Sequence, residues 1–136
     1  MSKLVVSWSP LRIQHAPHLV FVPKYRHKVF NKAHLAYLKE LFSEICADFN
    51  ATLKEFNGEE DHVHLLVEYC LSTSVSKLVN SLKGVSSRLL KKRYPVLTKW
   101  YYKNALWSPS YFASTCGGAP LAVLEEYIKN QKVPTT

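Results

Sequence analysis

The chain has 136 residues, which is enough for one domain with a real core and too short for two. Lysine and arginine number 18 against 10 acidic residues; this formal charge of +8 suggests a polyanionic partner, nucleic acid or an anionic membrane surface, unless it is only a solvated face. No apolar run approaches the roughly 20 residues of a membrane span, and residues 1–10 lack the apolar core of a secretory signal. The three cysteines are widely spaced, so we expect reduced thiols in a cytoplasmic protein, with neither a disulfide framework nor a zinc cluster.

The first half of the chain predicts a strand, a helix and a second strand. Residues 18–23 form a short apolar, β-branched run that is typical of a buried strand. From residue 31 to residue 49 the apolar positions follow the helical period, with Asn31 as the expected N-cap. Residues 51–56 alternate as a strand does, and Asn57-Gly58 predicts a hairpin turn into the next strand, with a loop lengthened by Glu59 and Glu60 as the alternative.

The second half predicts a basic helix, an aromatic region and a terminal helix. The basic helix is expected to begin within residues 72–76 and to be stopped by Pro95. Residues 99–115 are dense in aromatic and β-forming residues, which favours one or two strands. Gly117-Gly118 is expected to be a flexible joint before a last helix at about residues 120–132.

The order of these elements predicts an α+β fold. Strand–helix–strand–strand–helix–strand is the arrangement of ferredoxin-like and RRM-like folds, in which an antiparallel sheet carries both helices on one face. The C-terminal helix is then extra, and it is free to lie near the other face of the sheet or against a second subunit.

The strand after the predicted turn carries two histidines, His62 and His64. Because side chains alternate along a strand, these two imidazoles share one face, and Val63, Leu65 and Val67 share the other. Two imidazoles at this spacing can hold one metal ion. Taken alone, the stretch is equally typical of two ordinary histidines on a half-exposed strand.

The terminal helix carries Tyr127 and Gln131 one turn apart on the edge of its apolar face. Taken singly, Tyr127 is more typical of an aromatic residue at the boundary of the core, and Gln131 of a solvated amide. Together with His62 and His64 they form a coherent chemical set. A metal ion held by the two imidazoles and the amide oxygen could polarise a phosphate, which Tyr127 could attack to give a phosphotyrosine ester.

The motif His62-Val63-His64 and the downstream run Tyr127-Ile128-Lys129-Asn130-Gln131 closely resemble the small single-tyrosine HUH transposases of bacterial and archaeal insertion sequences, the TnpA type. Further blocks at residues 18–26, 74–88 and 106–112 look like segments of the same family, in the same order. The resemblance implies one HUH domain over residues 1–136, with a ferredoxin-like core at 15–115 and a mobile tyrosine helix at 119–132.

The same resemblance implies a metal-dependent enzyme of DNA transposition and recombination. His62, His64 and Gln131 would bind a divalent metal ion, Mg²⁺ or Mn²⁺. Tyr127 would cleave single-stranded DNA and keep its 5′ phosphate as a phosphotyrosine intermediate. Members of the family recognise DNA hairpins near the element ends and work as homodimers, in which the tyrosine helix can dock into the partner's histidine site. Each active site would then be composite.

Five residues are candidates for contacting that DNA because cations and an aromatic ring suit a nucleic-acid surface: Lys24, Tyr25, Arg26, Lys83 and Arg88. A polar loop and a solvated helix face are the alternatives.

Three other functions stay open: a noncatalytic nucleic-acid-binding module, a metal-dependent hydrolase with an activated water, and a domesticated relative that acts on chromosomal repeats.

Overall fold

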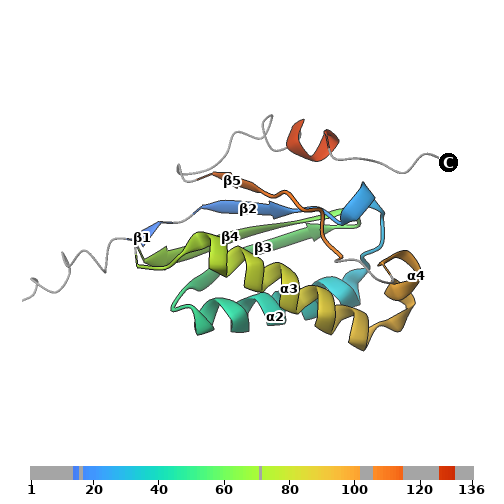
Figure 1. Cartoon of the computed structure of the whole chain (residues 1–136), viewed down its shortest axis with the longest axis horizontal. Coiled ribbons are helices and arrows are strands. Elements are labelled where there is room, and N and C mark those ends of the chain that lie inside the picture. Colours follow the sequence, from blue (N-terminus) through green and yellow to red (C-terminus); the bar gives the residue numbers. More distant parts are fainter. Residues whose placement is uncertain (1–13, 16, 71, 102–105, 115–125, 131–136) are drawn as a thin grey trace, which may run out of the picture.

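The computed structural model describes residues 14–15, 17–70, 72–101, 106–114 and 126–130. One sheet contains the strands β1 (Gln14–His15), β2 (His18–Phe21), β3 (Thr52–Glu59), β4 (His62–Cys70) and β5 (Phe112–Ser114). Two long helices, α2 (Lys32–Asp48) and α3 (Val75–Arg93), cover one face of that sheet (Figure 1). The shorter helical turns are η2 (Lys24–Arg26), η3 (Pro95–Leu97) and α4 (Thr98–Tyr101). None of the described helices is long and apolar enough to cross a membrane.

The sheet has the strand order of the predicted ferredoxin-like fold. Strand β4 pairs antiparallel with β3 on one side and with β1 and β2 on the other. The pairs Gln14–Cys70 and His18–Leu66 share one register, so β1 and β2 are two parts of a single line along β4. Strand β5 pairs antiparallel with β2 and completes the order β3-β4-β2-β5. The predicted α+β fold with both helices on one face is confirmed.

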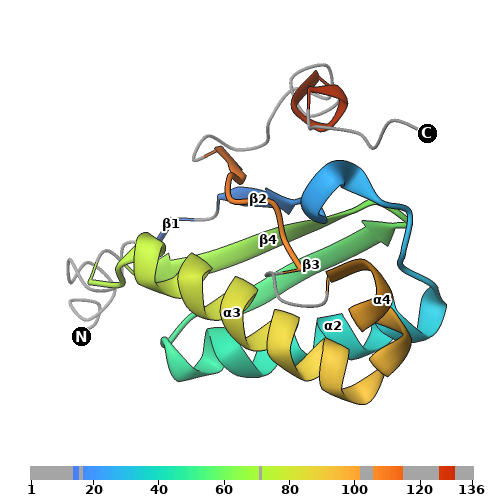
Figure 2. The ribbon, with the colours of Figure 1, turned by 45° about the vertical axis from the view of Figure 1, so that its right-hand side comes forward.

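Strand β4 separates the hydrophobic core from an open face of the sheet. Val63, Leu65 and Val67 are fully buried in the core, whereas His62 and His64 alternate with them and are only half-buried. The two histidines therefore share a face, as predicted. Figure 2 shows the long helices on one side of the sheet and the short helical segment at residues 126–129 on the other.

Both long helices begin and end where the sequence predicts. Asn31 caps α2 by accepting a hydrogen bond from the backbone N–H of His34, at 2.8 Å. Ser74 caps α3 by accepting one from the backbone N–H of Lys77, at 3.3 Å. Helix α3 ends shortly before Pro95, because the residue before a proline is disfavoured in the helical region.

The predicted hairpin turn at Asn57-Gly58 is wrong. Both residues lie inside β3 and pair with β4, and the turn falls at Glu60 and Asp61. A β-carbon added to Gly58 would lie 2.5 Å from Cδ2 of Leu35 on α2. The glycine therefore permits a close approach between helix and strand, a role that a local turn pattern does not distinguish from a turn.

Of the one or two strands predicted within residues 99–115, one is present, β5, and the start of the region is helical instead. Residues 98–101 are helical, because the turn that begins at Pro95 continues into α4. Among the residues of this region that the structure describes, Phe112–Ser114 form the strand. The aromatic Tyr101 is buried in the core, and its hydroxyl donates to the backbone carbonyl of Lys24 at 3.1 Å. The aromatic density of this region reflects core packing as much as strand formation.

The predicted terminal helix is described only at residues 126–130, of which 126–129 are helical. Gln131, Gly117-Gly118 and the remainder of the predicted helix lie outside the described residues.

Two serines of α3 anchor the segment that leads to β5. The Trp107 indole donates to the Ser86 hydroxyl, and the Leu106 backbone N–H donates to the Ser87 hydroxyl, both at 2.9 Å. Leu106 in turn accepts from the backbone N–H of Lys24 at 2.8 Å. These bonds hold the residues after β2 and the residues before β5 against the same helix, which sets the edge of the open face.

Replacing Ser86 by alanine is expected to lower the free energy of unfolding by about 1–3 kcal/mol, because the buried indole N–H of Trp107 loses its acceptor. Chemical denaturation measures this difference. The exposed Ser76 on the same helix provides the control, since Ser76→Ala should be nearly neutral. Equal effects of the two substitutions would contradict the assignment.

Candidate active site

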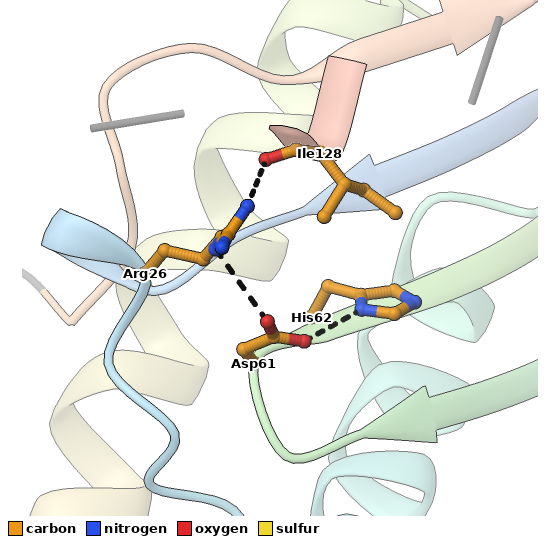
Figure 3. A network of polar contacts seen from close by, with 4 residues as sticks. All are labelled: Arg26, Asp61, His62 and Ile128. Carbon is orange, nitrogen blue, oxygen red and sulfur yellow. Dashed lines mark hydrogen bonds and ion pairs between the residues drawn. The ribbon is translucent and has the colours of Figure 1, made fainter. Parts of the chain in front are cut away.

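The Asp61 carboxylate orients the first histidine of the open face. Its Oδ1 lies 3.0 Å from Nδ1 of His62 (Figure 3). A carboxylate at this nitrogen favours the tautomer in which Nδ1 carries the proton, which leaves Nε2 as the nitrogen with a lone pair. Histidines that bind metals commonly have such a partner, because it fixes the ring and raises its basicity.

The second histidine, His64, contacts a third one, His18 of β2. His18 Nδ1 lies 2.6 Å from His64 Nε2, and the two rings stack with centroids 4.8 Å apart. Burial lowers the pKa of His64, and the neighbouring His18 and His62 lower it further against the opposing effect of Glu55. His64 is therefore neutral at neutral pH, the form in which an imidazole binds a metal ion.

The donor set of the open face fits a divalent metal ion in part. His62 offers its Nε2, and His64 is neutral, although its Nε2 is shared with His18. Within the described ranges, no group of three or more histidine, cysteine, aspartate or glutamate side chains is arranged to hold a metal ion. The predicted set needs only two such side chains, because its third member is the amide of Gln131, which lies outside those ranges.

Tyr127 lies on the helical segment above this face of the sheet. Its ring packs on Phe112 of β5, with centroids 5.6 Å apart, and its hydroxyl lies 3.1 Å from the Ser110 hydroxyl. Burial raises the pKa of the Tyr127 phenol, and the hydrogen bond with Ser110 acts in the opposite direction. The phenol is therefore protonated at neutral pH, and any attack by its oxygen requires removal of that proton.

Lys83 of α3 holds the segment before β5, which carries Ser110. Its ammonium donates to the backbone carbonyls of Ser108 at 2.6 Å and of Ser110 at 3.2 Å. Burial lowers the pKa of Lys83. The sequence made Lys83 a candidate for contacting DNA; in the structure its ammonium already binds these two backbone carbonyls. Arg88, the other candidate on α3, is exposed. Helix α3 itself lies on the side of the sheet opposite the open face (Figure 2).

Arg26 connects the tyrosine segment to the histidines. Its Nη1 donates to the backbone carbonyl of Ile128 at 3.0 Å, and its Nε lies 3.6 Å from Oδ2 of Asp61 (Figure 3). Since Asp61 also binds His62, one chain of contacts runs from the residue after Tyr127 to a predicted metal ligand.

Sequence reasoning missed His18, Asp61 and Ser110. Asp61 directly precedes His62, and this adjacency in the sequence could have identified it as the partner of that histidine. His18 meets His64 only because β2 and β4 pair with the register Val20–His64, which makes the two histidines diagonal neighbours. Ser110 is joined to Tyr127 only by the fold.

Comparisons with known proteins agree with this architecture. The protein family described as "Transposase IS200 like" matches residues 12–131. The ISDra2 transposase TnpA of Deinococcus radiodurans is 32% identical over 114 residues, which cover 84% of this chain and 81% of that protein. The transposase for insertion sequence element IS200 of Salmonella typhimurium is also 32% identical over 114 residues, covering 84% of this chain and 74% of that protein. A crystal structure from D. radiodurans R1, assigned as a transposase, superimposes with a TM-score of 0.82 at 29% identity and covers 90% of this chain and 94% of that one.

The ferredoxin-like sheet, the paired histidines and these relatives together define a class, the transposases of insertion sequences. The chain belongs to the IS200-like transposase family. As a transposase it acts on DNA, and its activity is the cleavage and transfer of DNA strands.

Replacing Ser110 by alanine is expected to raise the pKa of Tyr127 further, because the hydrogen bond that opposes the effect of burial is lost. An ultraviolet titration of Ser110→Ala minus that of Ser110→Ala/Tyr127→Phe isolates the signal of the Tyr127 phenol. The same difference between the wild type and Tyr127→Phe gives the reference pKa. An unchanged or lower pKa would show that the hydroxyl of Ser110 does not favour the phenolate.

Proposed function

We propose that this chain cleaves and rejoins single-stranded DNA at the ends of an insertion sequence, with Tyr127 as the nucleophile. The observation that carries the proposal is the chain of contacts from the tyrosine segment through Arg26 and Asp61 to His62. These contacts link Ile128, the residue after Tyr127, to His62, the first histidine of β4 (Figure 3). A tyrosine and a pair of imidazoles are the groups that the proposed reaction needs.

In the cleavage step, the Tyr127 oxygen attacks the phosphorus of a phosphodiester. The new bond joins Oη to phosphorus, the bond from phosphorus to the 3′ oxygen breaks, and the proton lost by the phenol is balanced by the proton that the 3′ oxygen gains. The products are a 5′-phosphotyrosine and a free 3′ hydroxyl. Because one ester replaces another, a 3′ hydroxyl can reverse the step and join two strands.

We assign a divalent metal ion, Mg²⁺ or Mn²⁺, to His62, His64 and the amide oxygen of Gln131. When bound, the ion supplies polarisation of the phosphate and neutralises its charge. The protein contributes the rest: Asp61 fixes the ring of His62, and burial keeps His64 neutral. Because imidazole ligands favour Mn²⁺ over Mg²⁺, Mn²⁺ should support activity at least as well.

The loop after β2 and the turn α4 supply a surface suited to single-stranded DNA. His27 packs between two exposed rings, 6.1 Å from that of Tyr25 and 4.7 Å from that of Trp100, centroid to centroid. Tyr25 and Trp100 are 40% and 48% exposed, and Lys24 and Lys99 each place an ammonium near one of them. Exposed rings can stack on bases while nearby cations bind phosphates. This arrangement supports two of the predicted DNA contacts, Lys24 and Tyr25, and adds Trp100.

Trp100→Ala is expected to weaken binding of a single-stranded oligonucleotide by about 1–3 kcal/mol, the contribution of one stacked base. Fluorescence anisotropy measures the affinity without cleavage if Tyr127→Phe is the background and no metal is added. Trp100→Phe should retain most of the affinity. Val96→Ala removes a neighbouring exposed apolar side chain and serves as the control. Equal affinities of all four proteins would exclude stacking at Trp100.

Wild-type protein incubated with Mn²⁺ and end-labelled single-stranded DNA from the element ends should give a covalent protein–DNA band on a denaturing gel. Tyr127→Phe should give none, because the phenol oxygen forms the bond. Chelation should abolish the band, and added Mn²⁺ or Mg²⁺ should restore it.

The other results of this assay each favour a different function. Cleavage that survives in Tyr127→Phe without an adduct would indicate a hydrolase that activates water. Binding without cleavage by the wild type on its cognate ends would indicate a binding module, and activity only on chromosomal repeats would indicate a domesticated relative. We also propose a homodimer, which a mixture of Tyr127→Phe and His62→Ala chains tests. In a mixed dimer the tyrosine of one chain and the intact histidines of the other form the adduct only if they act in trans.

A further inference from the structure

Arg26 contacts two parts of the molecule that lie far apart in the sequence. One end of its guanidinium donates to the backbone carbonyl of Ile128, 102 residues away, and the other faces Asp61. The carbonyl belongs to the residue directly after Tyr127, so the contact fixes the backbone of the tyrosine segment.

The turn that presents Arg26 has an unusual backbone. Tyr25 and Arg26 have φ angles of 64° and 53°, the left-handed region that residues other than glycine rarely adopt. The Arg26 N–H closes the turn by donating to the carbonyl of Pro23 at 2.7 Å. Such strained conformations persist where the surrounding structure requires them, and they concentrate at functional sites. Here the turn places the arginine between the tyrosine segment and the histidine strand.

The Asp61 carboxylate is shared between the two sides of this network. Its Oδ2 faces Arg26, while its Oδ1 accepts from His62. The side chains of Arg26 and Asp61 are only 23% and 19% exposed, so solvent screens their attraction less than it screens a surface ion pair. Because one carboxylate binds both residues, a change in the position of Arg26 is expected to alter the contact of Asp61 with His62, and the reverse.

We propose that Arg26 is a positioning residue that couples docking of the tyrosine segment to the orientation of His62 through Asp61. This inference rests on the proposed function for its catalytic meaning. Coupling of this kind is reciprocal: occupation of the histidine site stabilises the docked segment, and docking strengthens ligand binding at the histidines. Arg26 is thus assigned a role inside the protein in addition to the DNA contact that its charge suggested.

Hydrogen exchange in the DNA-free, metal-free protein tests the docking contact directly. The backbone N–H of Asn130 donates to the carbonyl of Glu126 at 3.0 Å and reports on the helical turn that contains Tyr127. Arg26→Gln should accelerate its exchange roughly tenfold, because a charge-assisted hydrogen bond to this turn is lost. Lys28→Gln, which removes one exposed charge from the same loop, should leave the exchange unchanged.

The affinity for Mn²⁺ alone tests the coupling. Arg26→Gln and Asp61→Asn should each weaken Mn²⁺ binding several-fold, and the double variant should be no weaker than the worse single variant, because both act through one network. Mn²⁺ should slow exchange at Asn130 in the wild type and not in Arg26→Gln. Arg26→Lys keeps the charge but cannot span both partners, so it should behave as Arg26→Gln does, which would show that loss of the charge is not the cause. An unchanged midpoint of chemical denaturation in both variants would show that loss of folding is not the cause.

Unchanged exchange at Asn130 in Arg26→Gln would overturn the inference, even if that variant bound single-stranded DNA more weakly; Arg26 would then be a phosphate contact only. Additive effects of Arg26→Gln and Asp61→Asn on Mn²⁺ affinity would overturn the coupling as well. Failure of the proposed function would look different. If the wild-type protein formed no adduct with DNA but the exchange and affinity effects were present, the positioning role of Arg26 would stand and only its link to DNA cleavage would be lost.

Discussion

The two-residue period of β4 is the constraint on which the rest of the structure depends. One set of its side chains is fully buried under α2 and α3, so the strand cannot shift its register by one residue without exposing Val63, Leu65 and Val67. The same constraint fixes His62 and His64 on the opposite face. Core packing thus orients the candidate metal ligands, and their positions follow from the stability of the fold.

The open face is in turn defined by polar contacts between distant elements. His18 reaches His64 from β2, Asp61 orients His62 from the turn before β4, and Arg26 extends this network to the tyrosine segment. Lys83 adds a contact from the helical layer, where its ammonium binds the carbonyls on either side of Pro109. Charged groups thus position the backbone around the site, in addition to any contact that they make with DNA.

Local patterns predicted the regular elements well and their exceptions poorly. The helical periods and caps Asn31 and Ser74 located both long helices, because these signals act within one turn. Gly58 resembled a turn residue, and its actual role, close approach to Leu35, depends on a residue of α2 more than twenty positions earlier in the chain. Tyr101 likewise owes its place to the core, where its hydroxyl binds the carbonyl of Lys24.

The sequence by itself determined the layered fold, the shared face of the two histidines and the resemblance to the IS200-like transposases, because these depend on side-chain period and on short motifs. Only the tertiary structure decided which residues surround the site. His18 and His64 are 46 positions apart, and Arg26 and Ile128 are 102 apart. Such pairs meet through the strand register and the path of the chain over the sheet, and no local pattern in the sequence encodes a contact that exists only after the sheet has formed.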